Sequence, residues 1–211
     1  MKSQIIGISG SPIKNSNTDR IVQAILDASG LETKFVKLSN ITVGPCRACR
    51  LCVEDNICKV KDDFPALAED LKKADAYVIG CYCPYSMIDA FTKAFLERLW
   101  SMRHVNNLNR GKLVVTSVTG MAQPIREMIN RSLMLESMME KMELLGQLEV
   151  EGNVPCLTCG RGGDCEMSGV KFRYGPDAEA SADLCVSVES QEEVWNEALR
   201  LGQELGKRLT S

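Results

Sequence analysis

Short apolar segments alternate with amphipathic segments along this chain of 211 residues, and this alternation constrains its fold most strongly. Repeated strand–helix units favour a parallel sheet covered by helices on both faces, since that arrangement buries every apolar face. Residues 74–81 are apolar almost throughout, as in a central strand. The predicted strands are 4–9, 33–38, 74–81, 112–118 and 147–154, and the predicted helices are 19–28, 64–71, 88–102, 124–145 and 189–209. We therefore expect one α/β domain over residues 1–211, built on a doubly wound five-stranded sheet.

Cysteine is the compositional outlier, with ten residues in the chain. No apolar stretch is long enough for a membrane span, so we expect a cytoplasmic protein that contacts no membrane. In a reducing compartment, clustered cysteines bind metal or carry redox chemistry more often than they form disulfides. The net charge of −3 and the 5% of aromatic residues argue against a nucleic-acid partner.

The loop after the first predicted strand is rich in hydroxyl groups. It runs Ser9-Gly10-Ser11-Pro12-Ile13-Lys14-Asn15-Ser16-Asn17-Thr18 and leads into a helix. A helix N-terminus attracts anions, and the ligand crevice of a doubly wound sheet lies beyond the carboxyl ends of its strands. The loop is neither a Walker A nor a GxGxxG sequence. Its position favours a phosphate site, and the alternative is that Ser16 or Asn17 only caps the helix.

Four cysteines within thirteen residues form a first group, Cys46-x2-Cys49-x2-Cys52-x5-Cys58. The opening C-x2-C-x2-C is shared with bacterial ferredoxins, in which cysteine thiolates hold iron–sulfur clusters. A Cys₄ zinc site and a group without metal are the alternatives. The spacing favours an iron–sulfur cluster over both. Cys81 and Cys83, after the central strand, are interpreted as buried inert thiols.

The segments SGSPxxxSNT and CPYSM, the latter leading into AFTKAFLERL, resemble the flavodoxin-like flavoproteins, in particular the NAD(P)H-dependent FMN reductases. The resemblance spans nearly the whole chain and implies a flavodoxin-like fold that binds FMN. It implies that the phosphate is held by Ser9, Ser11, Ser16, Asn17 and Thr18. It also implies that the flavin ring is bordered by Pro84, Tyr85, Ser86, Met87, Thr119 and Gly120.

With its first cysteine group, the chain resembles the iron–sulfur flavoproteins of anaerobic archaea and bacteria. The resemblance implies one 4Fe–4S cluster on Cys46, Cys49, Cys52 and Cys58, and a homodimer or homotetramer in which this cluster approaches the flavin of a neighbour. The expected function is electron transfer between a reduced donor and an acceptor, either a small redox molecule or a ferredoxin-like protein. The use of NAD(P)H is left open. The alternative is an NAD(P)H-dependent FMN or quinone reductase whose cysteine group is structural. No catalytic side chain is assigned.

A second cysteine group lies in the segment 155–188, which lacks apolar periodicity. It comprises Cys156, Cys159, Cys165 and Cys185, and its first part is rich in glycine. An ordered loop of this length generally needs an anchor. A second cluster or another metal would provide one, and unligated thiols in a loop ordered by packing are the alternative.

Overall fold

The computed structural model describes residues 4–211 and contains a five-stranded sheet with every neighbouring pair parallel. The strand order is β2-β1-β3-β4-β5, so the direction of winding reverses between β1 and β3. The strands are β1 (Gln4–Ser9), β2 (Glu32–Lys37), β3 (Ala76–Tyr82), β4 (Leu113–Gly120) and β5 (Glu143–Glu151). The predicted doubly wound α/β fold is confirmed.

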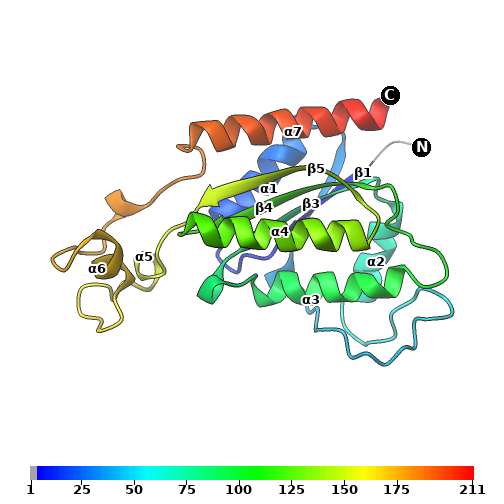
Figure 1. Ribbon diagram of the computed structural model, residues 1–211, viewed down its shortest axis with the longest axis horizontal. Coiled ribbons are helices and arrows are strands. Elements are labelled where there is room, and N and C mark those ends of the chain that lie inside the picture. The colour runs from blue at the N-terminus through cyan, green and yellow to red at the C-terminus, as the bar shows by residue number, and fades with distance from the viewer. Residues whose placement is uncertain (1–3) are drawn as a thin grey trace.

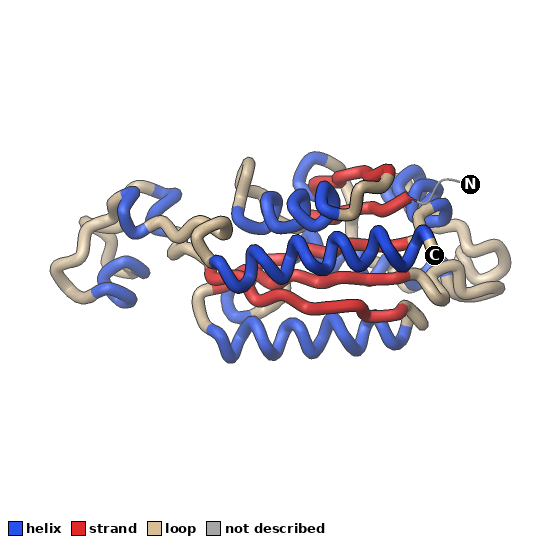
Figure 2. The backbone as a smooth tube through the Cα atoms, turned by 90° about the horizontal axis from the view of Figure 1, so that it is seen from above, coloured by secondary structure: helices blue, strands red, loops and turns tan. Residues whose placement is uncertain are grey.

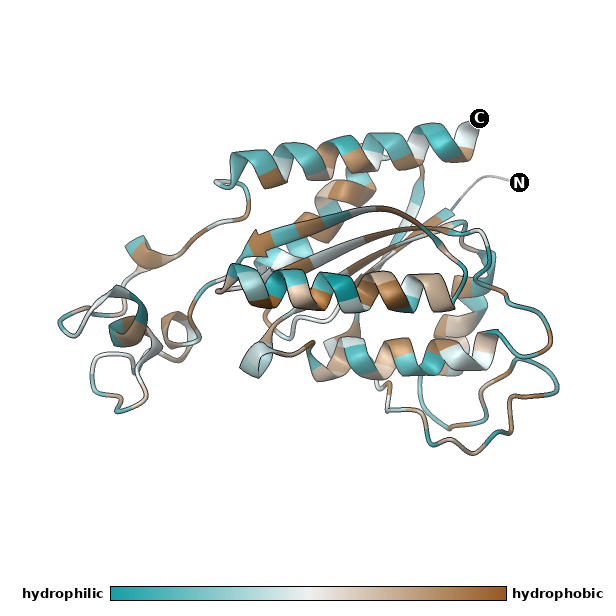
Figure 3. Ribbon diagram, in the orientation of Figure 1, coloured by the Kyte–Doolittle hydropathy of each residue, from teal (hydrophilic) through white to brown (hydrophobic). Residues whose placement is uncertain are grey.

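Helices cover both faces of the sheet (Figure 1). They are α1 (Asn17–Ala28), α2 (Phe64–Lys73), α3 (Ala90–Leu99), α4 (Gln123–Met139), α5 (Cys156–Cys159), α6 (Gly169–Tyr174) and α7 (Glu192–Thr210). Helices α1 and α7 pack on one face, with Ile21, Ile25 and Leu201 fully buried. Helices α2, α3 and α4 pack on the other, around residues such as Phe64 and Phe95. The strands are mostly apolar, while the outer side of α7 is hydrophilic (Figure 3).

Several predicted boundaries are wrong, around β5 (predicted as 147–154, observed as Glu143–Glu151) and at the end of β4. The predicted helix 124–145 ends at Met139, and β5 starts at Glu143, because Glu143 pairs with Leu113 across the sheet. A short apolar stretch fits both periodicities, and here strand pairing decides. The fourth strand runs on to Gly120, so Thr119 and Gly120 belong to β4 rather than to the loop after it.

The segment after β5 forms a small lobe beyond the strand ends, which we call the C-terminal lobe (residues 154–186). Figures 1 and 2 both show it projecting from one end of the sheet. It contains α5, α6 and a short 3-10 turn, Ala182–Leu184, so it is not irregular throughout as its sequence predicted. Within residues 4–211, no helix combines the length and the hydropathy needed to cross a membrane.

Candidate functional site

The segments that follow β1, β3 and β5 meet at the carboxyl end of β4, at Thr119 and Gly120. The Thr18 hydroxyl, in the first turn of α1, donates to the Thr119 hydroxyl (2.9 Å), and the Cys83 N–H donates to the Thr119 carbonyl (3.0 Å). The next carbonyl, of Gly120, accepts from the N–H of Gly152 (3.0 Å). The fold therefore brings the first predicted loop together with the ends of β3, β4 and β5, at the edge where this architecture binds ligands.

The loop after β1 is folded by its own hydroxyl groups. Ser9 and Ser11 are buried. The Ser9 hydroxyl donates to the Asp19 carboxylate (2.6 Å), and the Ser11 hydroxyl oxygen accepts from the N–H of Ile13 (3.3 Å). The N–H of Gly10 donates to the Gly80 carbonyl on β3 (2.9 Å), which ties the loop to the sheet. The loop is thus fixed by its own hydrogen bonds, and it carries both N–H and hydroxyl groups.

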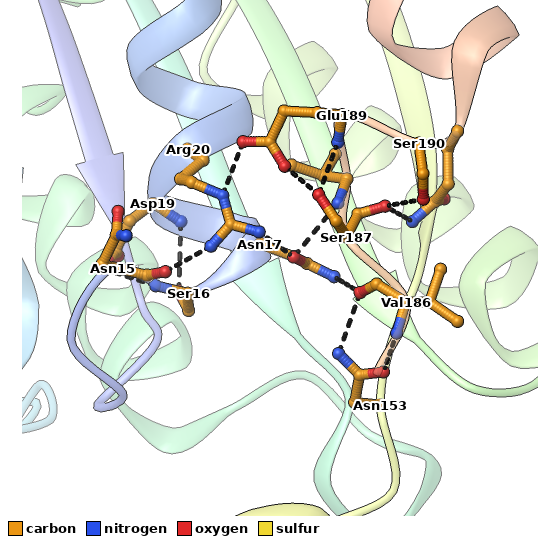
Figure 4. A network of polar contacts seen from close by, with 12 residues as sticks. Asn15, Ser16, Asn17, Asp19, Arg20, Asn153, Val186, Ser187, Glu189 and Ser190 are labelled. Carbon is orange, nitrogen blue, oxygen red and sulfur yellow. Dashed lines mark hydrogen bonds and ion pairs between the residues drawn. The ribbon is translucent and has the colours of Figure 1, made fainter. Parts of the chain in front are cut away.

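The side chains of Ser16 and Asn17 have other partners at the start of α1 (Figure 4). Ser16 caps the helix, because its hydroxyl oxygen accepts from the N–H of Asp19 (3.1 Å). The Asn17 amide donates to the Val186 carbonyl (2.9 Å) and accepts from the N–H of Val188 (3.2 Å). The Ser16 N–H donates to the Asp19 carboxylate (3.2 Å), so of these two residues Asn17 can meet an anion through its backbone N–H group, at the positive end of the helix dipole.

Asp19 is a residue of this region that the sequence interpretation missed. Its carboxylate is buried beside a predicted anion site and forms an ion pair with Lys37 of β2 (2.5 Å). The pair neutralises a charge that would repel a phosphate. The pattern Ser16-x-x-Asp19 is the local signal of the cap, since a capping box places an acidic side chain three residues after Ser or Thr. No local sequence pattern indicates that Lys37 pairs with Asp19.

The loop after β3 holds two successive non-glycine residues in the left-handed region, Tyr85 (φ 48°) and Ser86 (φ 61°). Such residues cost about 1–3 kcal/mol each and cluster at functional sites. Below the loop, the buried Asp89 carboxylate accepts from the Thr92 N–H (2.7 Å) and from the Tyr82 N–H (3.2 Å). Burial raises the pKa of Asp89 although these hydrogen bonds oppose the rise. The loop is anchored at its base, and Tyr85 and Met87 are exposed at its tip.

The two thiols beside this loop are shielded. Cys81 is fully buried, and burial raises the pKa of its thiol well above the usual value. Cys83 is half-buried, and burial raises its pKa to about 11 even though the Arg126 charge opposes the shift. Both thiols are therefore protonated at neutral pH and are poor nucleophiles there.

The first cysteine group lies on the long segment between β2 and α2. Cys46 and Cys49 are exposed, Cys52 and Cys58 are half-buried, and none forms a disulfide. Burial raises the pKa of Cys52, and the charges of the other three thiols add to the rise. Across residues 4–211, no three Cys, His, Asp or Glu side chains are placed to hold a metal ion. The fit to a metal thus rests on the donor set: four neighbouring thiols, the ligands that iron–sulfur clusters and zinc accept.

Arg98, near the end of α3, anchors this segment and was not predicted. Its side chain is almost fully buried, and it donates to Cys58 Sγ (3.2 Å) and to the Asp62 carboxylate (2.5 and 3.0 Å). It also donates to the Gly44 carbonyl (3.0 Å), so it joins both ends of the segment. Burial by itself would raise the pKa of Asp62, but hydrogen bonds from Arg98, Gly44 and Phe64 outweigh it and lower that pKa. In the sequence, Arg98 is one charged residue of an amphipathic helix.

The first cysteine group and the Thr119 site lie at opposite ends of the sheet. Asn56 donates to the Asn106 carbonyl (2.7 Å) and accepts from the N–H of His104 (2.7 Å), in the loop that precedes β4. Thr119 is at the far end of the same strand. A strand of eight residues is about 26 Å long at 3.3 Å per residue. The cysteine segment and the site at Thr119 are therefore separated by about the length of the sheet within one chain.

Comparisons with known proteins agree with this arrangement. A sequence profile described as NADPH-dependent FMN reductase matches residues 3–140. An iron-sulfur flavoprotein of Methanocaldococcus jannaschii is 32% identical over 103 residues, which are 47% of this chain and 53% of that protein. An iron-sulfur flavoprotein of Methanosarcina thermophila is 33% identical over 113 residues, 52% of this chain and 59% of that protein. The matches thus span a little over half the length of these relatives.

Solved structures share the fold at low sequence identity. The NAD(P)H:quinone oxidoreductase from Methanothermobacter marburgensis superposes with a TM-score of 0.64 at 14% identity, covering 97% of this chain and 96% of that one. A flavone reductase gives the same TM-score and identity and covers 99% of this chain and 63% of that one. At these identities the likeness concerns the fold.

Proposed function

Since this chain belongs to the NADPH-dependent FMN reductase family and is an oxidoreductase, we propose that it acts like its relatives named iron-sulfur flavoproteins and transfers electrons between FMN and a 4Fe–4S cluster. One observation carries the flavin half of this proposal: the phosphate-type loop of β1, the N-terminus of α1 and the strained loop of β3 converge at Thr119. Bound FMN supplies electron chemistry in single or paired steps.

The residues present fit FMN. The buried Ser117 hydroxyl has no partner within residues 4–211, and Ser117 lies in the same row of the sheet as Ser9 and Gly80. Such an unpaired group is a place where a ligand or water supplies the partner. The phosphate would be held by Ser9, Ser11, Ser16, Asn17 and Thr18, with Asn17 acting through its N–H group. The ring would be bordered by Pro84, Tyr85, Ser86, Met87, Thr119 and Gly120.

The cluster would be held by Cys46, Cys49, Cys52 and Cys58. Four thiols within thirteen residues of one segment support this ligand set, and so do the names of the archaeal relatives. The Arg98 guanidinium already donates to Cys58 Sγ (3.2 Å). Hydrogen bonds to ligand sulfur tune the reduction potential of a cluster, so Arg98 would have this role.

The position of the cysteine segment supports an oligomer. Electron transfer slows steeply with distance, and the segment and the Thr119 site of one chain are at opposite ends of the sheet. We infer that the cluster of one subunit serves the flavin of a neighbour in a homodimer or homotetramer. Helix α4 offers a surface for assembly, because an apolar stripe on its outer side is exposed. Its members are Met128, Leu135, Met138 and Met139.

The flavin site is tested by Ser11→Ala combined with Thr18→Ala. A hydrogen bond to a charged group contributes about 1.5–3 kcal/mol, so we expect FMN to bind at least about tenfold more weakly. Titration of FMN-free protein, followed by flavin fluorescence, measures the dissociation constant. Ser132→Ala removes an exposed hydroxyl from α4 and serves as the control. An unchanged constant for the double variant would mean that these hydroxyls only shape the loop.

The cluster is tested by metal, sulfide and flavin analysis of protein purified without oxygen. We expect about four irons and one FMN per chain, with iron–sulfur absorption that dithionite bleaches. Zinc in place of iron would contradict the cluster.

A second candidate function follows from the family described by its profile: an NAD(P)H-dependent FMN or quinone reductase with a structural cysteine site. NADPH turnover that Cys49→Ser leaves unchanged would favour it over the relay. The donor and acceptor of the relay are proposed to be a small redox molecule or a ferredoxin-like protein.

A further inference from the structure

The C-terminal lobe has too small an apolar core to account for its order. Its buried cluster contains three residues, Val154, Cys156 and Val170. The lobe is tied to the rest of the protein mainly by polar contacts at its base, including the ion pair of Arg173 with Glu151. Small units that cannot build a core are usually stabilised by disulfides or by a structural metal. The lobe carries four cysteines, and none of them forms a disulfide.

Cys156 is at the centre of the lobe. Its side chain is buried, and its Sγ accepts from the N–H of Gly169 at the start of α6 (3.2 Å). The loop after α5 wraps closely around it, since a Cβ added to Gly162 would lie 3.2 Å from the Cβ of Cys156. Cys159 is one helical turn further on, and Gly160 ends the turn in the left-handed region (φ 71°). A Cys-x2-Cys pair on one turn is the usual spacing of two zinc ligands.

The other two cysteines come from segments that pack around the same centre. Cys165 is in the turn that leads into α6, where its carbonyl accepts from the N–H of Ser168 (3.2 Å). Ser168 caps α6, and the next residue, Gly169, contacts the Cys156 sulfur. Cys185 directly follows Leu184, which packs against the buried cluster. The four cysteines thus lie on three segments of the lobe that pack around one small core.

We propose that Cys156, Cys159, Cys165 and Cys185 bind one Zn²⁺ ion, which holds the C-terminal lobe together. Zinc takes four thiolates in a tetrahedron and needs no other ligand, and each thiol releases one proton on binding. No three of these side chains stand at metal-binding distance among residues 4–211, so binding would draw the exposed sulfurs of Cys159 and Cys185 inward. Coupling of this kind between metal binding and local folding is common in small metal-bound units.

This zinc site is independent of the proposed flavin and cluster sites, and its chemistry is structural. It nevertheless has a physical link to the flavin edge. The Asn17 amide, in the first turn of α1, holds the Val186 carbonyl (2.9 Å) and the Val188 N–H (3.2 Å) at the end of the lobe. Loss of the metal is therefore expected to loosen the segment that Asn17 holds, while leaving the sheet folded.

The experiment is elemental analysis of the full-length protein, purified without oxygen from zinc-supplemented cells. Wild type, Cys159→Ser, Cys185→Ser and the control Cys46→Ser are compared. We expect about one zinc per chain in wild type and in Cys46→Ser, and almost none in the other two variants, whose mutated thiols are exposed and so need not disturb folding. Hydrogen exchange should accelerate in residues 154–186 of Cys159→Ser and remain unchanged in the sheet.

Two results would overturn the proposal. Metal contents that are equal in wild type and Cys159→Ser would mean that the second group is empty. Loss of iron and sulfide, rather than zinc, from Cys159→Ser would mean that it holds a second cluster. Failure of the first cysteine group to bind iron would contradict the proposed electron relay. It would not affect the test of the zinc site, because the zinc content is measured separately.

Discussion

Gly10, in the loop after β1, offers the sharpest test of the candidate flavin site. A Cβ built at this position would lie 2.0 Å from the Thr92 hydroxyl oxygen and 2.6 Å from both carboxylate oxygens of Asp89. Both neighbours are fully buried, and the Asp89 carboxylate accepts from the N–H and the hydroxyl of Thr92 (both 2.7 Å). Gly10→Ala therefore forces either the buried pair or the loop itself to move.

The size of the effect follows from these two ways of relieving the clash. Overpacking a buried site costs about 1–3 kcal/mol. If the carboxylate moves instead, it gives up a hydrogen bond to a charged group, which contributes about 1.5–3 kcal/mol. We expect the free energy of unfolding to fall by roughly 1–3 kcal/mol. If the loop moves, its N–H and hydroxyl groups leave their positions, and FMN affinity falls by at least about tenfold.

Two assays read out these alternatives. Urea unfolding of the FMN-free protein measures stability, and fluorescence titration with FMN measures affinity. Gly163→Ala is the matched control, because a Cβ at Gly163 meets no atom within 4 Å. The reasoning is refuted if Gly10→Ala matches Gly163→Ala within about 0.5 kcal/mol and binds FMN with the wild-type constant.

Three further predictions concern other parts of the molecule. Arg98→Met leaves Asp62 as a buried charge without its ion partner and should lower the free energy of unfolding by about 3–5 kcal/mol. The control Arg208→Met breaks an exposed ion pair and should cost less than about 1 kcal/mol. Equal losses for the two variants in urea unfolding would contradict the anchoring role of Arg98. Burial raises the pKa of Glu140 despite opposing hydrogen bonds, so its ionisation destabilises the folded state: the contribution of the neutral acid is present at low pH and is lost as pH rises through the folded pKa. Glu140→Gln should therefore gain stability relative to wild type as the pH rises above about 4.5, the ordinary pKa of Glu, and a difference independent of pH would argue against this. Cys83, with a pKa raised to about 11, should react with iodoacetamide at pH 8 roughly a hundredfold more slowly in the native protein than in urea, as mass spectrometry of the labelled peptide would show.

The phosphate-type loop and the cysteine spacing could be recognised from sequence because their signals are local. Hydroxyl groups and glycine follow an apolar run directly, and four thiols fall within thirteen residues. The partners of these groups could not be recognised in the same way. Thr18 meets Thr119 across 101 positions, Asn17 meets Val186 across 169, and Arg98 meets Cys58 across 40. The use of the Ser16 hydroxyl as a cap was one of two alternatives that the sequence left open.

The sequence by itself determined the order of strands and helices and the doubly wound class, because apolar periodicity is a property of neighbouring residues. Only the tertiary structure decided where α4 ends and β5 begins, since the pairing of Glu143 with Leu113 outweighs the helical spacing of the preceding residues. It also decided that the first cysteine group and the Thr119 site lie at opposite ends of the sheet. Both the boundary and the separation of the two sites depend on how the strands and helices pack. Packing brings together residues that no local sequence pattern connects.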